Sequence, residues 1–67
     1  MTPLWTPETL ARAVLWGPID ATRMAKLRRH VPTGTDVREL LAALARVTTP
    51  ATVQAVRDGL ARLGVTP

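Results

Sequence analysis

The chain of 67 residues contains no cysteine, serine, asparagine, tyrosine or phenylalanine. Without cysteine it can form neither a disulfide nor a thiolate metal site, which are common supports of very small domains. Zinc would have to be bound by one histidine and five scattered carboxylates, so we expect no metal and no cofactor. Stability must then come from packing of the hydrophobic residues, which make up 46% of the chain.

The residues that usually carry out catalysis are also scarce. Serine and cysteine nucleophiles are absent, and the single histidine, His30, follows the basic stretch 26–29. Asp20, Asp36 and Glu39 stand where helix caps are expected, and no glycine pattern for binding phosphates or dinucleotides occurs. We therefore predict that the protein is not an enzyme.

Long hydrophobic runs are missing as well. No apolar stretch approaches the roughly 20 residues needed to span a bilayer. The first residues, Met1–Trp5, lack the cationic start and apolar stretch of a signal peptide. We expect a cytoplasmic protein with no membrane partner. Arginine outnumbers lysine eight to one, a bias typical of GC-rich coding sequences, which suggests a bacterium or its phage.

Proline and glycine divide the chain into four segments that have the periodicity of short helices. Thr6 is a favourable N-cap, and the first helix should run from there to about Trp16, where the Gly-Pro pair at 17–18 ends it. Asp20 is predicted to cap a second helix that reaches roughly His30. A break should follow at 32–34.

The third segment has the clearest amphipathic pattern. Asp36 followed by Glu39 resembles a capping box, although Thr35 is an alternative cap. The fourth helix should begin after Thr49, with proline at its first position, and Gly64 fits the left-handed residue beyond its end. No segment alternates with period two. The predicted fold class is all-α, a compact bundle of four short helices forming one domain over 1–67.

The last two helices, with a short turn at 46–49 between them, resemble the helix-turn-helix of DNA-binding regulators. The turn lacks the usual glycine and the spacing is about two residues too long, so a plain helical hairpin is the alternative. In the DNA-binding motif the second helix enters the major groove, where glutamine can bind adenine and arginine can reach guanine or phosphate. The residues that would face DNA are Thr49, Thr52, Gln54 and Arg57.

Positive charge gathers near the end of the second helix. The chain has a net charge of +4 and a pI near 11.5. Cations at a helix C-terminus are stabilising without any ligand, but four of them within seven residues exceed what capping requires. This flank is predicted to face phosphates or an acidic protein surface, through Arg23, Lys26, Arg28 and Arg29.

Trp5 and Trp16 are eleven residues apart, a spacing that returns to nearly the same face of a helix. We expect both to be core residues. If Trp16 is exposed instead, it would form a protein-binding interface together with Leu15.

These features support two hypotheses about function. The first is a small basic DNA-binding regulatory protein of bacterial or phage type that acts as a homodimer through its helix-turn-helix-like pair. The alternative is a helical adaptor or inhibitor that docks on an acidic face of a larger protein. An exposed apolar patch around Leu15 and Trp16, rimmed by arginine, would favour the alternative.

Overall fold

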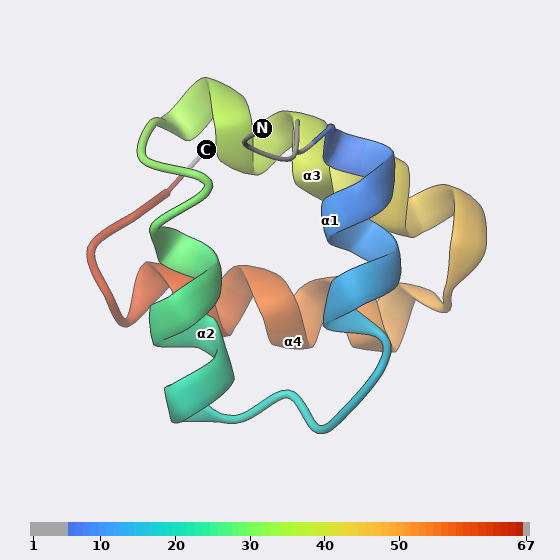
Figure 1. Ribbon diagram of the computed structural model, residues 1–67, viewed down its shortest axis with the longest axis horizontal. Helices are drawn as coiled ribbons and strands as arrows, with labels where there is room; N and C mark the ends of the chain where they lie inside the picture. The colour runs from blue at the N-terminus through green and yellow to red at the C-terminus, as the bar shows by residue number, and fades with distance from the viewer. Residues whose placement is uncertain (1–5, 67) are drawn as a thin grey trace, which may run out of the picture.

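The computed structural model describes residues 6–66, and this part of the chain contains helices and no strand. The helices are α1 (Pro7–Val14), α2 (Ala21–Arg28), α3 (Gly34–Val47) and α4 (Pro50–Ala61). Figure 1 shows them in chain order from blue to red. The predicted all-α bundle of four short helices is confirmed.

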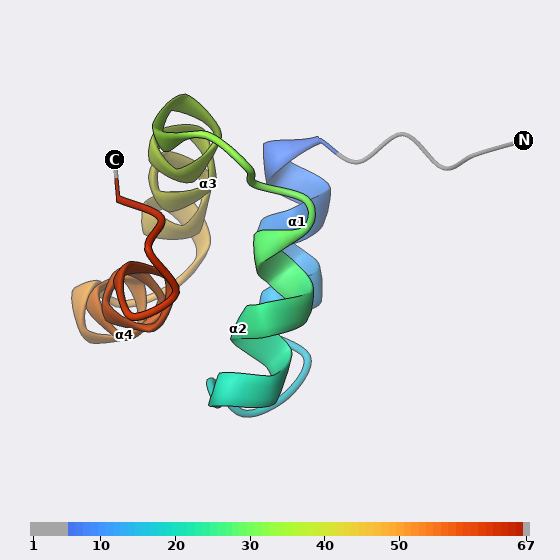
Figure 2. The ribbon, with the colours of Figure 1, turned by 90° about the vertical axis from the view of Figure 1, so that its left-hand side faces the viewer.

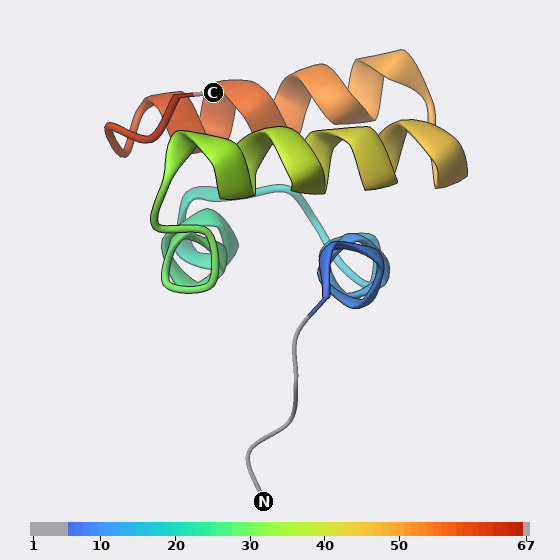
Figure 3. The same cartoon turned by 90° about the horizontal axis from the view of Figure 1, so that it is seen from above.

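The helices form two layers, which are seen most clearly from above (Figure 3). α3 and α4 lie side by side in one layer, and α1 and α2 lie in the other with their axes running across the first pair. Between the layers α1 packs on α3 and α2 packs on α4. Figure 2 gives the same arrangement from the side, with α3 and α4 seen almost end-on. The layers bring together segments that are far apart in sequence.

Three of the predicted N-caps are confirmed. The Thr6 side chain accepts a hydrogen bond from the Thr9 N–H of α1, and Asp20 accepts one from the Arg23 N–H of α2. The hydroxyl of Thr49 accepts one from the Thr52 N–H of α4. Each cap satisfies a donor that the first turn of a helix leaves without a partner, which fixes where the helix begins.

The predicted start of the third helix is wrong. Neither Asp36 nor Thr35 is the N-cap of α3, because Thr33 has the extended backbone and accepts from the Asp36 N–H at 3.1 Å. In turn the Asp36 carboxylate accepts a hydrogen bond from the Thr33 N–H, and the two bonds together form a capping box. Gly34, which was expected to belong to a break, is the first residue of the helix.

The helix ends differ from the prediction by about two residues. α1 ends at Val14 rather than Trp16, and α2 ends at Arg28, with His30 in the turn that follows. Beyond α4, Gly64 has the predicted positive φ of 84°. The N–H of Val65 donates to the Leu60 carbonyl across this glycine, as in a Schellman motif.

A single cluster of buried aliphatic side chains joins the two layers, and no polar residue within 6–66 is buried. Most of its members are leucine, valine and methionine, and Val65, which follows α4 in the chain, also belongs to it. The cluster consists of Leu10, Ala11, Val14, Met24, Leu27, Val31, Val37, Leu40, Leu41, Ala43, Leu44, Val56, Leu60 and Val65.

Gly59 allows α2 to approach α4 closely. A Cβ atom at this position would lie 2.7 Å from Cγ of Met24 and 3.2 Å from its sulfur. Alanine would favour the helix by about 1 kcal/mol, but here it would overlap a side chain of the core. The glycine is therefore explained by the helix crossing.

The expected helix-turn-helix pair is not confirmed. α3 and α4 run antiparallel and lie side by side, and only Thr48 and Thr49 separate them in sequence. In a helix-turn-helix motif the two helices instead meet at a large angle. The geometry is that of the alternative, a plain helical hairpin.

Within residues 6–66, no helix has the length and apolar character needed to cross a membrane.

Candidate functional site

The most exposed large hydrophobic side chain among the described residues is Trp16, in the turn after α1. The indole is 89% exposed, and neighbouring Leu15 is 36% exposed. The prediction that Trp16 is a core residue is therefore wrong, while Trp5 lies outside the described residues. An eleven-residue spacing indicates a shared face of a helix, but it does not show that this face is the buried one. Trp16 follows the buried Val14 by two positions, or about 200° around a helix, and so points away from the core.

A cation lies close to this exposed pair in sequence. Arg12 is exposed, belongs to the last turn of α1 and precedes Trp16 by four residues. Arg12, Leu15 and Trp16 together are called the Trp16 corner below. An exposed apolar and aromatic pair accompanied by arginine is the combination expected above for a protein-binding surface.

Arg23 holds the backbone of this corner from the neighbouring helix. Its Nη1 donates to the carbonyl oxygens of Val14 at 2.9 Å and Pro18 at 2.8 Å, and its Nη2 donates to that of Ala13 at 2.7 Å. The last carbonyls of a helix have no intrahelical partner, so the guanidinium satisfies the end of α1 and the loop beyond it. Arg23 was predicted to face a ligand, whereas in the structure its guanidinium binds backbone carbonyls of the same chain.

The other cations predicted on α2 are free. Lys26, Arg28 and Arg29 are exposed, and in the described part of the chain none of their side chains has a hydrogen-bond or ion-pair partner. Lys26 follows Met24 by two positions, or about 200° around the helix. Since Met24 packs toward Gly59, Lys26 faces away from α4.

The candidate DNA-facing residues of α4 lie elsewhere. Arg57 is exposed and is about 200° around the helix from Gly59, which faces α2. The structure therefore does not bring Arg57 together with the outward cations of α2. Gln54 donates to Asp58 at 2.8 Å, and the Thr49 and Thr52 hydroxyls lie 3.1 Å apart, so these groups already have partners within α4 and its cap.

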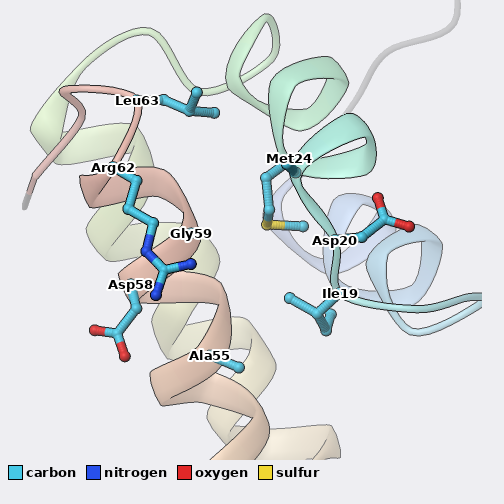
Figure 4. A pocket seen from close by; sticks show the side chains of 9 residues that line it. Ile19, Asp20, Met24, Ala55, Asp58, Gly59, Arg62 and Leu63 are labelled. Carbon is cyan, nitrogen blue, oxygen red and sulfur yellow. The ribbon is translucent and has the colours of Figure 1, made fainter.

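Two hollows flank α2. Figure 4 shows the first, which lies between the start of α2, with Asp20, and the end of α4, with Asp58 and Arg62; the two carboxylates point away from each other. Both carboxylates have local partners, Asp20 as the cap of α2 and Asp58 as the acceptor from Gln54. Among residues 6–66 no group of three or more histidine, aspartate or glutamate side chains is placed to hold a metal ion.

The second hollow runs between α1 and α2 and is called the α1–α2 groove. It has an apolar floor and basic residues around it, and no carboxylate occurs among the described residues that line it. Its lining consists of Leu10, Ala13, Val14, Arg23, Met24, Lys26, Leu27 and His30. No local pattern in the sequence predicts this groove, because it depends on how two separate helices are placed.

Comparison of the chain with protein-family models, curated proteins and solved structures gives no significant match. The interpretation of the site therefore depends on its own geometry.

The role of Arg23 can be tested by substitution. Arg23→Met should lower the free energy of unfolding by about 2 kcal/mol, because two part-buried carbonyls and one exposed carbonyl lose their donor. For a domain of this size that corresponds to a fall in Tm of roughly 10 °C, measurable by circular dichroism.

Arg28→Met is the matched control for this experiment. Arg28 is exposed and without a partner in the described residues, so its loss should change the free energy by less than about 0.5 kcal/mol. Equal Tm values for the two variants would contradict the structural role of Arg23.

Proposed function

We propose that the protein is a helical protein-binding module that presents Trp16 to a partner with an acidic face. The observation that carries the proposal is the 89% exposure of the Trp16 indole. Tryptophan and arginine are the residue types that most often dominate binding energy at interfaces. A tryptophan buries about 150–250 Å² when covered, so its burial on a partner is strongly favourable.

The way the corner is held also favours binding. The three hydrogen bonds of Arg23 fix the backbone on both sides of Trp16 before any partner arrives. A fixed backbone loses less conformational entropy on binding, so more of the burial energy contributes to affinity. Only the side-chain torsions of Trp16 remain to be ordered.

Charge indicates the chemistry of the partner. Residues 1–31 contain five basic and two acidic residues, and so carry three of the four net positive charges of the chain. Arg12 in the Trp16 corner has no partner in the described residues and would meet a carboxylate on the other protein. We therefore infer a partner with an apolar pocket for the indole and acidic residues around it.

Trp16→Ala tests this function. A partner captured from host extract by the wild-type protein should bind the purified variant about 30-fold more weakly, as expected for an interfacial hot spot of about 2 kcal/mol. Calorimetric titration of the purified pair gives the Kd. The Tm of the variant should be unchanged, because the side chain makes few contacts in the free protein.

Val47→Ala serves as the control, since Val47 is also an exposed hydrophobic residue, at 54%, but lies at the end of α3. It should bind like the wild type. If all three proteins bind the captured partner equally, Trp16 is not the contact and the proposed function is wrong.

DNA binding is a second candidate, favoured by the free cations at the end of α2. Because α3 and α4 form a hairpin, we propose contact through Lys26, Arg28 and Arg29 rather than through a recognition helix. Such contacts address phosphates and carry little sequence preference. A homodimer would double the number of phosphate contacts. Sedimentation of the free and DNA-bound protein would show whether the protein is a dimer.

This candidate predicts a strong salt dependence. Three phosphate contacts per protomer give a slope of log K against log salt of about −2.7, measured by fluorescence anisotropy with duplex DNA. Replacing the three cations by glutamine should reduce the slope to near zero, whereas Arg57→Gln should leave it unchanged. Affinity that is insensitive to salt, or lost with Arg57→Gln, would contradict DNA binding through α2.

A further inference from the structure

We propose that the α1–α2 groove and the Trp16 corner together bind an acidic amphipathic helix of the partner. This inference rests on the proposed protein-binding function and names the kind of segment that would be recognised. Five features support it: the direction in which the groove opens, its charge, the absence of strands in residues 6–66, its nearness to the backbone of Trp16 and the small exposed area of its floor.

The groove opens on the side of the molecule away from α3 and α4. Its described lining comes entirely from α1, α2 and the turn after α2. Figure 3 shows that α3 and α4 lie on one side of the layer formed by α1 and α2. The other side of that layer is not covered by any of the four helices.

The charge around the groove selects an acidic occupant. Arg23, Lys26 and His30 are the polar residues of the described lining, and all three are basic in type. Lys26 is exposed and free, while Arg23 retains positive charge although its donors are engaged with carbonyls. A segment with carboxylates would be attracted here, and a basic segment would be repelled.

The absence of strands in residues 6–66 favours a helical occupant. Pairing of an extended peptide with an open sheet edge is one common mode of recognition, and residues 6–66 offer no such edge. Binding of a helix in a groove uses side chains instead. A helix places apolar residues along one stripe and carboxylates beside it, which matches an apolar floor with a basic rim.

One end of the groove lies near the backbone of the Trp16 corner. The Arg23 guanidinium lines the groove and lies 3.1 Å from where a Cβ on Gly17 would stand. Gly17 follows Trp16 directly, so the backbone of Trp16 is close to the Arg23 end of the groove. An occupant lying along α1 and α2 would reach it.

The exposed fractions of the side chains indicate which part of the surface supplies apolar contact and which part supplies charge. Leu10, Val14, Met24 and Leu27 of the floor are each at most 6% exposed, so the floor offers little area to cover. Trp16, at 89% exposed, offers far more. The indole therefore supplies most of the apolar contact, and the charged groove fixes the orientation and sign of what binds.

The inference can be tested with designed peptides. The probe is an 18-residue amphipathic helix with leucine on one face and glutamate along its flanks, labelled with fluorescein. The comparison peptide has lysine in place of glutamate. Binding of each to the full-length protein is measured by fluorescence anisotropy at two salt concentrations, with unlabelled duplex and single-stranded DNA as competitors.

We expect saturable binding of the acidic peptide only, weakened by salt. Lys26→Glu should weaken it by about fivefold, because attraction at the rim becomes repulsion, while Arg57→Glu on the far side of α4 should have less than a twofold effect. Trp16→Ala should weaken it at least tenfold. Since Lys26, Arg57 and Trp16 are exposed, the folded state should survive each change.

Three outcomes would overturn the inference: equal binding of both peptides, no saturable binding of the acidic peptide at millimolar concentration, and an unchanged Kd in Lys26→Glu. Displacement of the peptide by either DNA in wild type but not in Lys26→Glu would assign the groove to nucleic acid and also overturn it. These results are separable from the proposed function, because loss of the captured partner with Trp16→Ala does not depend on the peptide.

Discussion

The hydrogen bonds of Arg23 are the interaction on which the exposed surface of this protein depends. A helix of eight residues ends with carbonyl groups that water or another group must satisfy. By donating to the carbonyls of Ala13, Val14 and Pro18, one side chain from α2 ends α1 and fixes the loop that leads to α2. A planar guanidinium suits this task, since several donors lie in one rigid group.

The same interaction couples the interior to the surface. Arg23 follows the N-cap Asp20 by three residues and precedes the core residue Met24. The chain therefore uses three positions within residues 20–24 to cap α2, to bind the end of α1 and to pack against Gly59 of α4. Trp16 is left in solvent because it follows the buried Val14 by two positions, about 200° around a helix, and so points away from the core. Stability and the binding surface thus depend on the same few contacts.

Much of the fold follows from local chemistry and is therefore visible in the sequence. The caps at Thr6, Asp20 and Thr49 and the left-handed Gly64 each involve residues within a few positions of one another. The start of α3 was missed although its signal was present, because Thr33 and Asp36 also have the spacing of a capping box. Pro32 and Gly34 predict a break in the chain, and this prediction does not take account of the cap formed by Thr33, which lies between them.

The site was harder to predict because it depends on contacts between separate segments. Nothing in the local sequence shows that Arg23 reaches carbonyls five to ten residues earlier, or that Arg57 lies away from the cations of α2. The pair Leu15 and Trp16 was recognised as a candidate interface, although Trp16 was expected in the core. The prediction failed because the equal spacing of the two tryptophans does not show which face of α1 is buried, and the buried face is that of Leu10 and Val14.

The central claim is that Trp16 projects into solvent from a fixed backbone. Fluorescence of a Trp5→Phe protein, in which Trp16 is the sole tryptophan, measures this directly. The account predicts emission at the red, water-exposed end of the tryptophan range. It also predicts quenching by iodide at least as efficient as that of a short tryptophan peptide, because Arg12 attracts the anion. A blue-shifted spectrum that resists iodide in the dilute, partner-free protein would contradict the account.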